Sequence, residues 1–130
     1  MKRRILLTVV YFINIIMMCL PWFINLEGYQ VYGTMFHNPV GLMSLIVLFV
    51  GIWMKETYGE RLMIISWLVI IFMEIYEFLT WHIRIYGGTI DLSLSIALGQ
   101  REFYLAFFIS CISCLLFLFY KQLNQKRIVL

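Results

Sequence analysis

The chain has 130 residues, of which 63% are hydrophobic and 13% charged, and its formal net charge is +3. A soluble domain is roughly half apolar and about a quarter charged, so this composition indicates a membrane protein. The ten Lys and Arg residues stand at termini and loop ends rather than in a basic stripe, which argues against a protein that binds nucleic acid.

Long apolar runs divide the chain into four expected membrane spans. A helix needs about 20 apolar residues to cross a bilayer, so a chain of this length holds four or five such helices. The four runs cover residues 5–23, 39–54, 62–83 and 103–120, and a polar turn at 55–61 joins the second to the third. We therefore predict an all-α membrane protein in which residues 1–130 form one domain, an antiparallel bundle of four transmembrane helices.

The first two spans begin with recognisable signals. Lys2, Arg3 and Arg4 precede the first apolar run, as they would in a signal peptide. That run is too long for a signal peptide and no small-residue cleavage site follows it, so we predict a retained span. Pro39 suits the first turn of the second span because its missing N–H would be unpaired there, and Asn38 before it is a suitable N-cap.

The basic residues predict the orientation of the chain. With a cytoplasmic amino terminus, the outer segments carry only Arg84 and Arg101. The inner segments then carry Lys2, Arg3, Arg4, Lys55, Arg61, Lys121, Lys126 and Arg127. Because basic residues concentrate on the cytoplasmic side, we expect a multi-pass protein of a cell membrane with both termini in the cytoplasm. The lack of an organelle-targeting segment favours a bacterial membrane.

The two outer segments carry strand-like patterns. Apolar residues alternate strictly through residues 89–99, which is typical of a half-buried strand. Residues 24–38 show a weaker alternation, and the two segments, on the same side of the membrane, are expected to pair as a small outer sheet. The alternative for residues 89–99 is an interfacial helix. The strand is favoured because on a helix the five apolar residues would fall on two faces.

Two carboxyl groups lie deep in the third apolar run. Glu74 and Glu77 are i and i+3 on one helix face, and a charge near the bilayer centre costs about 2.5–3.5 kcal/mol. We therefore expect both to face protein, with Asn14 and Ser110 at the depth of Glu74 and Ser44 nearer Glu77. Three interpretations remain open: a hydrogen-bonded clasp between helices, an ion or ligand site formed by Glu74, Glu77, Asn14 and Ser110, and catalysis.

Further polar residues gather at the predicted outer rim. They are His37, His82, Arg84 and Glu102. His82 and Arg84 are two residues apart and do not share a helix face, and the spacing of the group does not match a metal site. Scattered anchoring at the interface is favoured over an outer polar pocket, and we predict no metal and no cofactor.

Small residues mark expected helix contacts. Ala106, Ser110 and Cys114 repeat at i, i+4 and i+8 in the fourth span, and Gly41, Ser44 and Gly51 lie along the second. Small side chains allow the backbones of membrane helices to approach closely. These positions therefore predict packing between helices or against a partner.

Cys111 and Cys114 form a CxxC pair in the fourth span. In this it resembles vitamin K epoxide reductase and the bacterial quinone reductases that form disulfides, which implies thiol redox chemistry. Those proteins relay electrons through a second cysteine pair in an outer segment, and this chain has no cysteine there. Packing is the favoured role for both residues.

The sequence contains no Gly-rich phosphate loop and no hydrolase triad pattern. We therefore expect a non-enzymatic accessory or oligomerising subunit of a membrane assembly. Its partners would be the lipid bilayer and either a second copy or a larger membrane protein. One alternative is a small proton- or cation-coupled transporter or channel that uses Glu74 and Glu77. A more distant one is a membrane thiol-redox or lipid-modifying enzyme.

Overall fold

The computed structural model describes residues 2–129 of the chain, and its side chains except those at 56, 120 and 123–129. Two ends of the predicted domain, Met1 and Leu130, therefore lie outside the described residues. The side chains of Lys126 and Arg127 also lie outside the described part of the chain. Both residues were counted in predicting the orientation.

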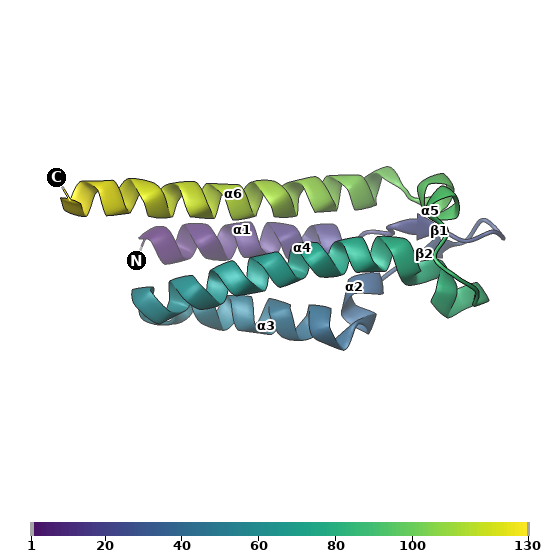
Figure 1. The fold of residues 1–130 in the computed structure, drawn as a ribbon, viewed down its shortest axis with the longest axis horizontal. Helices are drawn as coiled ribbons and strands as arrows, with labels where there is room; N and C mark the ends of the chain where they lie inside the picture. The colour runs from purple at the N-terminus through teal and green to yellow at the C-terminus, as the bar shows by residue number, and fades with distance from the viewer. Residues whose placement is uncertain (1, 130) are drawn as a thin grey trace.

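The described chain is mostly helical, with one small sheet. Its elements are α1 (Lys2–Met18), β1 (Phe23–Ile24), β2 (Gln30–Val31), α2 (Thr34–His37), α3 (Pro39–Trp53), α4 (Glu56–Tyr86), α5 (Leu92–Leu98) and α6 (Arg101–Val129). The four long helices α1, α3, α4 and α6 run up and down beside one another, and both termini lie at one end (Figure 1). The strands and α5 lie together at the other end. The prediction of a helical protein is thus confirmed.

Two of the long helices could cross a membrane by length and composition. These are the segments Thr57–Tyr86 of α4 and Arg101–Phe119 of α6, each with a mean hydropathy of 2.1. The α3 helix is also apolar but shorter. Two such helices indicate membrane association, whereas a protein with four spans remains a prediction.

The helix ends differ from the bounds of the predicted spans. The α1 helix ends at Met18, and α4 begins at Glu56, so the connection expected at residues 55–61 shrinks to Met54 and Lys55. This tight turn depends on Gly59, where an added Cβ would collide with the carbonyl oxygen of Gly51. Because the two glycines lack side chains, α3 and α4 touch closely just where the chain reverses.

Asn38 and Pro39 begin α3 as predicted. The Asn38 side chain accepts hydrogen bonds from the backbone N–H groups of Val40, at 3.0 Å, and Gly41, at 3.4 Å. Pro39 occupies the first helical position. The N-cap predicted from the sequence is therefore confirmed.

The strand expected at residues 89–99 is wrong. Asp91 caps a short helix instead, accepting a hydrogen bond from the backbone N–H of Leu94 at 3.1 Å. The cap satisfies a donor at the start of α5, and the helix leaves Leu92 and Ile96 largely exposed. The alternating pattern predicted a strand on the assumption that all of its apolar residues are buried, and in the structure some of them are exposed.

The small sheet forms within the first outer segment rather than between the two segments. Strands β1 and β2 pair antiparallel, with Phe23 opposite Val31. The two segments meet through one bridge between Phe23 and Gly99, and Gln100 donates its backbone N–H to the Trp22 carbonyl at 2.8 Å. We call residues 23–32 and 87–99 together the cap.

Stacked aromatic rings fix the cap to the helices. The Phe23 ring lies 4.7 Å from the ring of Trp81 on α4 and 5.4 Å from that of Phe103 on α6, centroid to centroid. Phe78 stacks on Phe103 at 4.9 Å. Because Phe23, Trp81 and Phe103 are almost completely buried, this cluster joins the ends of α4 and α6 to the sheet.

Candidate functional site

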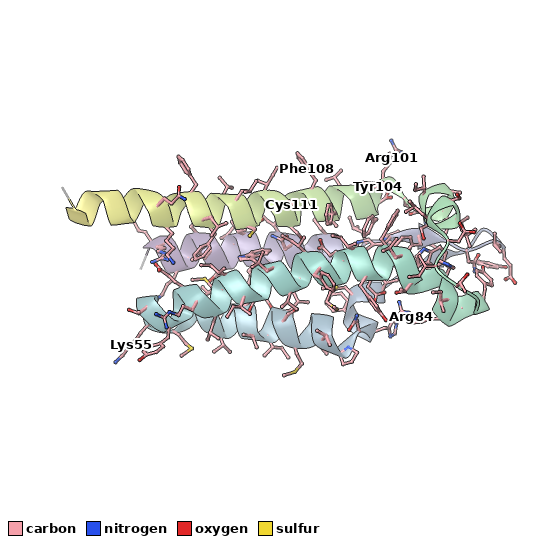
Figure 2. All side chains as sticks on the ribbon, in the orientation of Figure 1. Lys55, Arg84, Arg101, Tyr104, Phe108 and Cys111 are labelled. Carbon is pink, nitrogen blue, oxygen red and sulfur yellow. The ribbon has the colours of Figure 1, made fainter. Side chains whose placement is uncertain are left out.

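Glu74 and Glu77 both point into the protein. Their exposed fractions are 0% and 2%, although the surrounding helices carry many exposed apolar side chains. Phe108 on α6, for example, is 65% exposed and points away from the other helices (Figure 2). The chain thus presents apolar groups outward and these carboxyl groups inward.

Glu74 belongs to a polar chain that joins three helices. Ser110 on α6 donates to Oε1 of Glu74 at 2.7 Å, and the same hydroxyl lies 3.1 Å from Oδ1 of Asn14 on α1. Asn14 donates through Nδ2 to the Ser113 hydroxyl at 3.1 Å. We call Glu74, Ser110, Asn14 and Ser113 the polar chain. It ties α4 to α1 and α6.

The direction of the hydrogen bonds in the polar chain depends on the proton of Glu74. A serine hydroxyl has one proton, so Ser110 serves either Glu74 or Asn14 at a given moment. When the carboxyl group is ionised, Ser110 donates to it. When Oε1 carries a proton, it can donate to Ser110, and Ser110 is then free to donate to Asn14. Two arrangements of the same side chains are therefore available.

One carboxyl oxygen of Glu74 has no hydrogen-bond partner within residues 2–129. This atom, Oε2, is buried. A buried oxygen without a donor costs free energy unless a proton, a water molecule or an ion satisfies it. This atom is therefore the acceptor of the polar chain that a bound proton or ion would satisfy.

Glu77 has a different set of partners. Asn38 donates through Nδ2 to Oε1 of Glu77 at 3.2 Å, and the guanidinium group of Arg84 forms an ion pair with Oε2. Arg84 comes from two turns further along α4, and its side chain is 43% exposed. Glu77 is therefore held by a cation and by the residue that caps α3.

The site expected from the sequence is thus divided in two. Glu74, Asn14 and Ser110 come together as predicted, but no hydrogen bond joins Glu74 to Glu77 among the described side chains. Ser44 donates to the Gly41 carbonyl at 2.7 Å and not to either glutamate.

The sequence analysis missed two partners, Asn38 for Glu77 and Ser113 for Asn14. The position of Ser113, three residues after Ser110 on the same helix face, was the available signal.

The predicted outer-rim residues have different surroundings. His82 is buried, with Nε2 3.2 Å from the Thr89 carbonyl oxygen. His37 is exposed on α2, Arg84 pairs with Glu77, and Glu102 stands in the first turn of α6. Within the described part of the chain, no three His, Cys, Asp or Glu side chains lie close enough to hold a metal ion.

The small residues occupy close contacts. Ala106, Ser110 and Cys114 are buried along α6. A Cβ on Gly41 would lie 3.0 Å from Met35, and one on Gly51 would lie 3.2 Å from Leu62. Each glycine therefore removes bulk where a neighbouring helix approaches.

Cys111 and Cys114 are free thiols. Cys114 is 5% exposed, and Cys19 is free as well. The buried position of Cys114 agrees with a packing role.

Comparison of the chain with protein-family models, curated proteins and solved structures gives no match. The functional argument therefore depends on the geometry of this molecule alone.

Proposed function

We propose that the chain is a four-span membrane protein, with both termini in the cytoplasm, that serves as a non-enzymatic accessory subunit of a larger membrane assembly. The apolar helices α4 and α6 support the membrane location. The shorter helices α1 and α3 lie alongside them (Figure 1) and carry exposed apolar side chains of their own. These include Ile5, Val9, Phe12, Ile16, Met43, Ile46 and Val50.

The observation that carries the accessory role is the apolar surface of the cap. Six large side chains there are each more than half exposed, namely Leu26, Tyr29, Tyr32, Ile90, Leu92 and Ile96. Exposed apolar and aromatic groups gathered in one region mark an interaction surface. Because the cap lies beyond the helix ends, these groups would be offered to a partner outside the bilayer core.

The cap is also held in place, as a recognition surface requires. The backbone N–H of Leu26 donates to the Tyr86 hydroxyl at 2.8 Å, and Phe23 stacks on Trp81. A partner binding a pre-ordered surface loses less conformational entropy than one binding a mobile loop. The glutamates, which are buried inside the chain, serve contacts between its own helices in this proposal.

A co-purification experiment tests the role of the cap. The full-length protein would be extracted from bacterial membranes in lipid particles, as the wild type and as a triple variant with Leu26→Ala, Tyr29→Ala and Ile90→Ala. The matched control replaces Ile65, Leu105 and Phe108, which are exposed on the helices, with Ala. We expect a stoichiometric partner, or a second copy, to be lost from the cap variant alone.

A wild-type protein that is monomeric and free of partners in native lipid would contradict the accessory role. Equal loss of the partner from the cap variant and the control would instead contradict the cap as the contact surface, and would point to the membrane-facing surface of the helices.

The second candidate is a proton- or cation-coupled transporter, and the unpartnered Oε2 of Glu74 favours it. The polar chain runs from this carboxyl group to Ser113, which lines a cavity of about 330 Å³ between α1 and α6. A cation or proton entering there would meet Ser113 first and Glu74 last.

Flux measurements separate the two functions. The purified protein in liposomes would be given a proton or monovalent-cation gradient. Transport predicts flux that disappears in Glu74→Gln and survives in Glu102→Gln, a control glutamate outside the polar chain. An accessory subunit predicts no flux with either protein.

A further inference from the structure

Two cavities flank the start of α1, on opposite sides of the same two residues. One, of about 330 Å³, lies between α1 and α6. The other, of about 300 Å³, lies between α1, α3 and the start of α4. Arg3 and Leu7 line both. We call the first cavity the α1/α6 groove.

The α1/α6 groove is apolar along almost its whole length. Leu6 and Val10 from α1 face Leu116 and Phe119 from α6, and Arg3 stands at the end nearest the amino terminus. An apolar groove with a cation at one end matches a lipid, which has an acyl chain and a charged headgroup.

The end of the groove carries an excess of positive charge. Arg3 pairs with Glu60 at 3.0 Å, and Lys121 lies 3.8 Å from the same carboxylate. Arg4, which lines the second cavity, donates to the Met54 carbonyl at 3.2 Å. Two cations, Arg3 and Lys121, therefore share the single Glu60 carboxylate. Guanidinium groups bind phosphate through several directed hydrogen bonds.

We propose that the α1/α6 groove binds one anionic phospholipid of the cytoplasmic leaflet, with an acyl chain along the groove and the phosphate at Arg3 and the neighbouring Lys121. The proposal depends on the membrane location and the orientation proposed above. Basic pockets between transmembrane helices on the cytoplasmic side are known to bind anionic headgroups. A lipid would also cover the apolar residues Leu6 and Leu116, which are exposed in the chain alone.

Lipid retention measured by native mass spectrometry tests the site. The full-length protein would be released from nanodiscs that contain equal amounts of phosphatidylglycerol and phosphatidylcholine. We expect one phosphatidylglycerol to be retained about tenfold more often than phosphatidylcholine. Arg3→Gln with Lys121→Gln should abolish this preference. Lys2→Gln with Lys55→Gln removes the same charge from exposed positions that line neither cavity and should preserve it.

A second pair of variants tests the groove without touching the charges. Leu6→Trp places a larger side chain at the edge of the groove and should reduce retention of phosphatidylglycerol severalfold. Leu105→Trp, at an exposed position on α6 outside both cavities, should leave retention unchanged. Because Leu6 is 59% exposed, the substitution does not disturb the core.

The outcomes distinguish this proposal from the membrane assignment. Equal retention of the two lipids by the wild type, or equal effects of each variant and its control, overturns the lipid site while the protein remains a membrane protein. Extraction of the wild-type protein by alkaline carbonate, without detergent, would instead overturn the membrane location itself.

Discussion

Glu74 and Glu77 are one turn apart on α4 and equally buried, yet they have different partners. Glu77 has a cation, Arg84, and an amide donor, Asn38. Among the residues that the structure describes, Glu74 has only the hydroxyl of Ser110, and it forms no ion pair. The charge of Glu77 is thus compensated by a cation, whereas a charge on Glu74 would not be.

The difference shows that burial of a carboxyl group alone does not define its role. A charge removed from water is tolerated when a partner and hydrogen bonds replace the lost hydration. Glu77 meets this condition, so a structural role between α2, α3 and α4 explains it fully. Glu74 does not meet it, and a function of proton or ligand binding is therefore best sought at Glu74.

The largest expected effect is that of removing the cation from Glu77. Breaking a buried ion pair costs about 3–5 kcal/mol, and we expect about 2 kcal/mol for Arg84→Leu because the Arg84 side chain is 43% exposed. The free energy of unfolding in mixed detergent micelles, followed by tryptophan fluorescence, measures it. Arg101→Leu, an exposed arginine in the first turn of α6, is the control and should change little. Equal effects of the two substitutions would contradict the assignment of Arg84 to Glu77.

A smaller effect separates the two glutamates directly. In Glu77→Gln the new amide faces either the guanidinium group of Arg84 or the amide of Asn38, and a donor then meets a donor. We expect a loss of about 1–2 kcal/mol. In Glu74→Gln the amide can donate to Ser110, as a protonated carboxyl group would, and the change should stay below about 1 kcal/mol.

The same micelle unfolding assay compares these two variants. If Glu74→Gln were as destabilising as Glu77→Gln, the contrast between the two environments would be lost, and both residues would act as structural anchors. If Glu74→Gln instead left the protein stable but abolished transport, the role of Glu74 would be functional and not structural.

The sequence predicted the helices and the inward orientation of the glutamates, because both follow from local pattern and from the cost of burying charge. It also predicted the start of α3, since Asn38 and Pro39 are strong local signals. It did not predict that Glu74 and Glu77 would have separate partners. Residues i and i+3 lie about 60° apart around a helix, and only the positions of the neighbouring helices decide which partners each one meets.

The cap was the least predictable region for a related reason. An alternating pattern at residues 89–99 indicates a strand only if one face is buried, and here the short helix α5 leaves Leu92 and Ile96 exposed. The capping hydrogen bond of Asp91 is a local signal, but the sequence analysis did not use it. Contacts between distant segments, such as the bridge from Phe23 to Gly99, cannot be predicted from a local sequence pattern.

The smallest predicted effect tests the polar chain itself and uses a double-mutant cycle. Ser110→Ala and Glu74→Met each remove one partner of a single hydrogen bond, so their effects on the free energy of unfolding should not add. Hydrogen bonds between membrane helices contribute about 0.6 kcal/mol on average and at most about 1.7 kcal/mol, and the coupling energy should fall in that range. The matched cycle of Ser110→Ala with Glu77→Met should be additive to within about 0.3 kcal/mol, because the hydrogen bonds of Glu77 among the described side chains go to Asn38 and Arg84. Equal coupling in both cycles would mean that the two glutamates belong to one network, and a transport path would then have to include both.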